Sequence, residues 1–151
     1  FPQIAVMRAL PVPRRGSLAD SDRVMTRARL FGPVSDYFLT DTLLRDPAGG
    51  APPAQPVDGF IGITGQTCDW TIAARLVSEG SRPVILAGGL APDNVRQAVL
   101  RVGPAGVDSC TLTNRVDAAG RPVRFRKDRT KVEAFVRGAR AGVQALQRTE
   151  A

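Results

Sequence analysis

Four short apolar runs alternate with amphipathic helical stretches along almost the whole chain, and this alternation limits its fold more than any other feature. The apolar runs, flanked by proline or glycine, span residues 3–10, 35–41, 82–90 and 105–112. The helical stretches span residues 18–31, 69–80, 92–103 and 131–147. A repeated strand–helix order favours parallel strands with helices packed outside them, so the sequence predicts an α/β fold.

The helical stretches carry recognisable end signals. Ser17 can cap the first helix, Asp69 stands near the start of the second, and Gly80 follows its end. Pro92 opens the third stretch and Gly103 closes it. The side chains expected to face the core are Leu18, Val24, Ala28 and Phe31 in the first helix and Val132, Phe135, Val136 and Ala139 in the last.

The chain has 151 residues, which fits a single domain spanning 1–151. Two stretches interrupt the pattern and are expected to be long loops: the Pro/Gly/Ala-rich 45–59 and the basic 115–130. Each follows the carboxyl end of a strand, the side of an α/β fold on which ligands bind. Because the chain begins at Phe1 and an apolar strand starts at once, we expect an N-terminal part to be missing.

Composition narrows the class of protein. Apolar residues make up 43% and charged residues 23%, the balance of a globular protein. No apolar stretch approaches the roughly 20 residues that cross a bilayer, and nothing resembles a secretory signal. We therefore expect a cytoplasmic protein without a membrane partner. Cys68 and Cys110 give no disulfide framework.

The net charge of +7 raises the question of an anionic macromolecular partner. The basic residues cluster only in 121–131, where no nucleic-acid motif accompanies them. A solvated loop is the favoured interpretation, and no nucleic-acid partner is expected. The chain has no histidine, so proton transfer would fall to carboxylates or thiols. Neither a metal nor another cofactor is expected.

Two glycines end the third apolar run, in "PVILAGGLAPDNV" (83–95). Gly88 and Gly89 are followed by a helix start at Pro92 and Asp93. Bare backbone N–H groups beside a helix N-terminus can bind an anion. A tight turn that needs positive φ at a glycine explains the same residues, and the two interpretations stay about equal.

Small polar residues end the fourth run, in "GVDSCTLTN" (106–114). This cluster could donate to a phosphate or hold a polar ring substituent; its members are Asp108, Ser109, Cys110, Thr111, Thr113 and Asn114. An ordinary polar turn is the slightly favoured alternative. The cysteine thiols lack a histidine to activate them, so Cys68 and Cys110 are interpreted as small buried apolar residues.

Asp41 follows the apolar residues of the second run, in "YFLTDT" (37–42), ahead of the 45–59 loop. Catalytic acids of βα-barrels occupy this place, so Asp41 is the candidate proton donor, with a capping or loop carboxylate as the alternative. In "GITGQTCDW" (62–70), Thr64 stands between Gly62 and Gly65, as in a loop that folds over a ligand. Asp69 is equally explained as the start of a helix.

Taken in this order, these four segments resemble the C-terminal half of phosphoribosylanthranilate isomerase. The resemblance runs from the strand at Ile4 to the helix at Val132. It implies a (β/α)8 TIM barrel, of which this chain would supply strands five to eight. It also implies an Amadori rearrangement, in which an aminoaldose ribosyl phosphate becomes an aminoketose.

The resemblance also implies roles for particular residues. Asp41 would protonate the ring oxygen to open the sugar, while a cysteine base at the end of the first strand, outside this chain, would move the proton from C2. Backbone amides would hold the phosphate at Gly88, Gly89, Ser109, Cys110 and Thr111. Further substrate contacts would come from Thr64, Gly65 and Asp108.

The sequence departs from the family pattern in both ligand loops. Ile63 replaces a glycine and Gln66 a basic residue in the Gly-Gly-Thr-Gly loop, and Leu112 replaces the glycine of the Ser-Ser-Gly turn. A divergent or non-catalytic phosphosugar-binding barrel is therefore the alternative function. Four strands alone would leave two free sheet edges, so we expect an inactive chain that forms a homo-oligomer or pairs with an N-terminal half.

Overall fold

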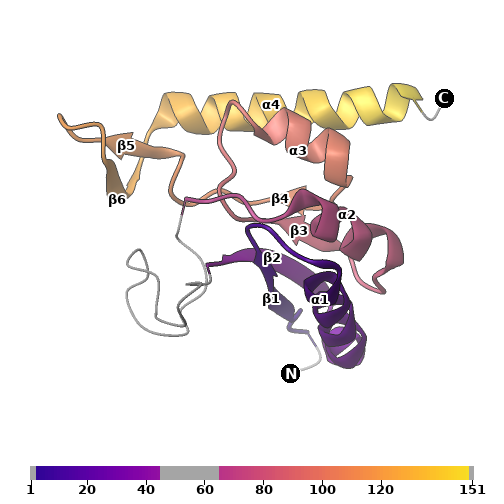
Figure 1. The fold of residues 1–151 in the computed structure, drawn as a ribbon. Coiled ribbons are helices and arrows are strands. Elements are labelled where there is room, and N and C mark those ends of the chain that lie inside the picture. The colour runs from indigo at the N-terminus through magenta and orange to yellow at the C-terminus, as the bar shows by residue number, and fades with distance from the viewer. Residues whose placement is uncertain (1–2, 45–64, 150–151) are drawn as a thin grey trace.

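The computed structural model describes residues 3–44 and 65–149, so the loop expected at 45–59 lies outside the described residues (Figure 1). The elements, in chain order, are β1 (Met7–Pro13), α1 (Leu18–Phe31), the 3-10 turn η1 (Gly32–Val34), β2 (Tyr37–Leu43), α2 (Trp70–Glu79), β3 (Val84–Leu86), α3 (Val95–Val102), β4 (Gly106–Val107), β5 (Asn114–Val116), β6 (Pro122–Lys127) and α4 (Arg129–Thr149). Each of the four predicted runs overlaps one of the strands β1 to β4, and each predicted helical stretch overlaps one of the helices α1 to α4.

Four of the strands form one parallel sheet in the order β1-β2-β3-β4. Strands that follow one another along the chain are neighbours in this sheet, and helices connect them, which confirms the α/β prediction. Within the described part of the chain β1 has a neighbour on one side only, so Pro11 and Pro13, whose nitrogens cannot donate to a neighbouring strand, interrupt no pairing there.

The helices cover one face of the sheet. In β2, Phe38, Thr40 and Thr42 are buried and lie on the same face as the core residues of β1 and β3. On the other face Tyr37 is 41% exposed, as expected when side chains alternate along a strand. Among the described residues, only the helix side of the sheet is covered.

The helix ends follow the predicted signals. Ser17 caps α1 in a reciprocal capping box with Asp20, and the Asp69 carboxylate caps α2 by accepting from Thr71 N at 2.9 Å. Gly103 ends α3 in a left-handed conformation. Pro92 is the exception: it was predicted to open the third helix, but it lies in a turn, and α3 begins only at Val95.

Two of the predicted core faces are partly wrong. Leu18 is 76% exposed, because it is the first residue of α1 and the buried stripe of that helix begins one turn later. In α4, Phe135 is buried as predicted, whereas Val132 and Val136 are exposed. The reason is that α4 packs along α3 rather than on the sheet (Figure 1).

The segment expected to be a long loop at 115–130 is instead mostly a two-stranded antiparallel ribbon. β5 and β6 pair with each other, and α4 already begins at Arg129. Asp117 closes the turn between the strands by accepting from Ala119 N and Arg121 N, both at 2.9 Å. The loop was predicted because the segment is rich in basic residues. Residues with a preference for strands are nevertheless present, namely Val116, Val123 and Phe125.

Gly142 sets the approach of α4 to α3. A Cβ at this position would lie 2.8 Å from Val99 Cβ and 3.2 Å from Arg96 O. Gly142→Ala should therefore lower the free energy of unfolding by about 1 kcal/mol, because overpacking outweighs the gain in helix propensity. Urea unfolding measures this, with the exposed Arg140→Ala as a control that should change little. A more stable Gly142→Ala would contradict the close packing.

Candidate functional site

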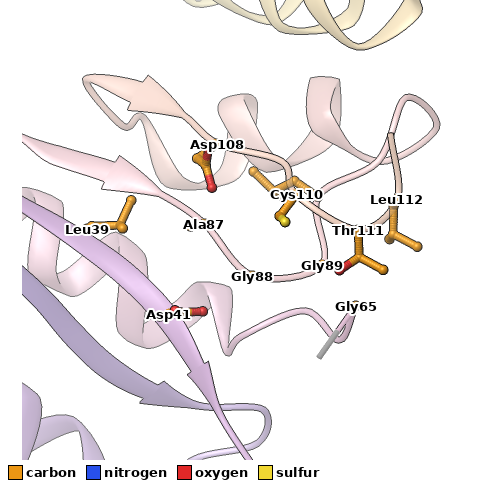
Figure 2. A pocket seen from close by; sticks show the side chains of 11 residues that line it. Leu39, Asp41, Gly65, Ala87, Gly88, Gly89, Asp108, Cys110, Thr111 and Leu112 are labelled. Atoms are coloured by element: carbon orange, nitrogen blue, oxygen red, sulfur yellow. The ribbon is translucent and has the colours of Figure 1, made fainter. Parts of the chain in front are cut away.

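The carboxyl ends of β2, β3 and β4 meet at one edge of the sheet, around a cavity of about 130 Å³. Figure 2 shows Asp41 on one side, Asp108 opposite it, and the Gly88–Gly89 backbone passing between them. The predicted residues that line the cavity are Asp41, Gly65, Gly88, Gly89, Asp108, Cys110 and Thr111. Parallel strands present their carboxyl ends together, so residues distant in sequence are gathered here.

Both glycines after β3 are required by the protein's own packing. Gly88 has φ +96°, and a Cβ there would lie 2.1 Å from Thr42 Oγ1. Gly89 has φ +58°, and a Cβ there would lie 2.3 Å from both the carbonyl carbon of Gln66 and the nitrogen of Thr67. The tight-turn interpretation is therefore confirmed. It does not exclude an anion site, because the same bare backbone also lines the cavity.

Two buried threonines, which the sequence analysis missed, hold the ends of the strands in place. Thr40 Oγ1 donates to Ala87 O at 3.0 Å and accepts from Ala87 N at 2.9 Å. Thr42 Oγ1 donates to Gln66 O at 2.7 Å, which ties the 65–67 loop to β2. The sequence did hold a signal for them: Thr40 and Thr42 are polar residues at alternate positions of β2, on the face that is buried. Buried hydroxyls are expected to be hydrogen-bonded.

Four backbone amides line the cavity on two adjacent turns. Among residues 3–44 and 65–149, the N–H groups of Gly88, Gly89, Cys110 and Thr111 donate to no acceptor. An amide without a protein partner binds water or a ligand, so these four donors suit an external acceptor. A tetrahedral oxyanion is such an acceptor.

Ser109 differs from the other predicted phosphate residues. Its hydroxyl donates to Leu90 O at 2.6 Å, and its side chain does not line the cavity. This bond joins the turn after β4 to the turn after β3. Ser109 is thus a link between the two groups of free amides. Thr64, another predicted contact, lies outside the described residues.

The surroundings of Asp41 raise the pKa of its carboxyl. Burial raises the pKa of the Asp41 carboxyl, and the negative charge of Asp108 raises it further. The N–H of Thr42, which donates to Asp41 Oδ1 at 2.8 Å, opposes this shift only in part. A carboxyl that keeps its proton can act as a general acid.

Neither thiol has a histidine to activate it as a base. Cys68 is buried with its Sγ 3.5 Å from Ala87 O, and burial raises the pKa of its thiol to about 11. Cys110 is half-buried at the cavity wall. Within the described ranges, no three Cys, Asp or Glu side chains gather in a way that could hold a metal ion. None of the helices there has the length and apolar character of a membrane span.

The chain has a parallel sheet, helices that connect its strands, and a cavity at the carboxyl ends of those strands. This arrangement is typical of α/β proteins. A comparison with protein families matches residues 11–137 to the family described as N-(5'phosphoribosyl)anthranilate (PRA) isomerase. The chain belongs to this family.

Individual relatives agree with this assignment. The N-(5'-phosphoribosyl)anthranilate isomerase of Haloferax volcanii is 40% identical over 81% of this chain and 46% of its own length. That of Rhodospirillum rubrum is 36% identical over 92% of this chain and 52% of its own. The solved isomerase of Pyrococcus furiosus has a TM-score of 0.60 at 25% identity, over 91% of this chain and 51% of its own. The chain therefore spans about half the length of these relatives.

The raised pKa of Asp41 makes a testable contribution to stability. Because its pKa is higher in the folded than in the unfolded chain, the folded state binds this proton more tightly, and stability falls as the pH rises through the folded pKa. Asp41→Asn removes that fall. Its free energy of unfolding relative to the unsubstituted chain should therefore increase between about pH 3 and about pH 7. Urea titrations across this range measure it, and parallel profiles would contradict the buried-acid assignment.

Proposed function

We propose that this chain is the C-terminal half of a phosphoribosylanthranilate isomerase and supplies strands five to eight of a (β/α)8 barrel. The support comes from the order of the parallel strands, the membership of the family and the coverage of about half of each relative. The single observation that carries the activity is Asp41, a half-buried carboxyl with a raised pKa at the wall of the cavity.

In this proposal Asp41 donates its proton to the ring oxygen of the substrate, and the sugar opens. The free amides of Gly88, Gly89, Cys110 and Thr111 bind the phosphate and fix the distance of the ring from Asp41. Gly65 and Asp108, on the cavity wall, contact the remainder of the substrate together with Thr64.

We propose that the base for the second proton transfer is the cysteine that the family resemblance places outside this chain. The chain has no histidine, Cys68 is buried with a raised thiol pKa, and Asp41 already serves as the acid. The cavity of about 130 Å³ is also smaller than the roughly 300 Å³ at which complete ligand pockets begin. We therefore place the base and the missing walls on the N-terminal half, and expect the chain alone to be inactive.

The activity is tested with the full-length protein, by following the fluorescence of the anthranilate group as phosphoribosylanthranilate is consumed. Asp41→Asn should lower kcat by roughly 10²- to 10⁴-fold, the usual contribution of a general acid. Asp22→Asn, at a surface ion pair with Arg75, is the matched control and should keep full activity. An Asp41→Asn protein as active as the unsubstituted one would end the assignment.

A second candidate function is a barrel that binds a phosphosugar without catalysis. Gln66 and Leu112 favour it, because they stand where the family pattern has a basic residue and a glycine. Against it, Leu112 has no positive φ, so the turn does not need a glycine there. Binding of a sugar phosphate by the full-length protein without any product would select this second function.

The exposed face of the sheet and its unpaired edge strands indicate that a partner covers them. Met7 is 56% and Tyr37 41% exposed on the face opposite the helices, and β1 and β4 are the edge strands of the sheet. We propose that an N-terminal half covers this face in the whole protein, and that a second copy covers it when the chain is alone.

Light scattering tests this association on the isolated chain. The mass should be at least twice the 16.1 kDa of one chain. Tyr37→Lys should shift the chain toward the monomer, since it places a charge within the covered face. Leu30→Lys, a change of a 68% exposed residue on α1, should not. A well-folded monomer of the unsubstituted chain would overturn the proposal.

A further inference from the structure

We propose that Lys127 is a positioning residue, which turns the amides of Cys110 and Thr111 toward the ligand from behind the turn. The inference rests on the phosphate site proposed above. It goes beyond that site, because it proposes that a side chain on the β5–β6 ribbon sets the orientation of those amides. Neither a role for this ribbon nor a role for Lys127 follows from the motifs in the sequence.

The ammonium group of Lys127 lies against the turn after β4. Its Nζ donates to Cys110 O, to Ser109 O at 3.2 Å and to Thr113 Oγ1 at 2.9 Å. An ammonium has three N–H donors, and these three acceptors use all of them. Lys127 therefore has no donor left for a ligand and acts only through the turn.

Because the peptide bond is planar, these contacts determine the direction of the N–H groups of Cys110 and Thr111. In a trans peptide the C=O and the following N–H point in opposite directions. Since Ser109 O and Cys110 O point at Lys127, the N–H groups of Cys110 and Thr111 point away from it. Cys110 and Thr111 line the cavity, and their amides donate to no acceptor in the described part of the chain.

The β5–β6 ribbon places Lys127 beside this turn. β5 begins at Asn114, directly after the turn, and Asn114 pairs with Lys127 on β6. Asp128 N donates to Thr113 O at 2.9 Å and fastens the end of the ribbon to the same segment. Without the ribbon, the turn would lose its cation.

The backbone of β6 shows that this return is not a regular hairpin. Phe125 has φ +61°, a conformation that residues with a side chain rarely adopt, and the register of β5 against β6 shifts between Asn114 and Val116. Bulges of this kind re-aim the side chains that follow them. Lys127 is two residues beyond Phe125.

The experiment measures the affinity for ribose 5-phosphate by calorimetry, at low salt and at about 1 M salt, where charge effects beyond about 3 Å are screened. Lys127→Met keeps the aliphatic stem and removes the donors. Arg126→Met, at the preceding and exposed position of β6, removes the same charge without touching the turn. Lys127→Gln, which retains two donors, guards against a Lys127→Met protein that fails to fold.

We expect Lys127→Met to bind about fivefold more weakly or worse at both salt concentrations, in the range of a lost charged hydrogen bond. Lys127→Gln should be intermediate, and Arg126→Met should stay within about twofold, as expected for a solvated charge.

Three results would overturn the proposal. Unchanged affinity of Lys127→Met would remove Lys127 and leave the phosphate site standing. Equal weakening of Lys127→Met and Arg126→Met that disappears in salt would show general attraction instead of positioning. Absence of binding by the unsubstituted chain would remove the proposed phosphate site, and the role of Lys127 with it.

Discussion

The peptide between Gln66 and Thr67 lies against Gly89 so closely that no side chain fits between them, and Thr42 lies equally close to Gly88. These contacts fix the backbone after β3 in positive-φ conformations. The Thr42 hydroxyl also donates to Gln66 O, so this one threonine connects β2, the turn after β3 and the loop before α2. The rest of the site depends on this junction, because it leaves amides without internal partners at the wall of a cavity.

The site separates its two kinds of polar group. Carboxylates lie at the ends of β2 and β4, where burial and mutual repulsion raise the pKa of Asp41. The unused N–H groups lie on the two adjacent turns, joined by the Ser109–Leu90 bond. An anion beside the amides and a protonated carboxyl at Asp41 would not oppose each other electrostatically. This separation is compatible with the phosphosugar substrate proposed above.

The strand–helix alternation was sufficient to predict the parallel sheet, and Asp41, Gly88, Gly89 and Asp108 could be assigned to one edge from their places after strands. The contacts that hold this edge were not predictable. Thr40 and Thr42 bond to residues 47 and 24 positions away, and no local pattern encodes such pairs. The ribbon was missed because the high charge of 115–130 suggested a loop. Leu18 was wrongly assigned to the core, because the apolar spacing of a helix does not show in which turn its buried face begins.

The central claim is that four free amides on two turns bind a phosphate, and amide-resolved NMR during titration with inorganic phosphate tests it most directly. The account predicts that the N–H resonances of Gly88, Gly89, Cys110 and Thr111 shift together and reach saturation at one common affinity. Shifts confined to the basic segment 121–131, or none at all, would contradict it.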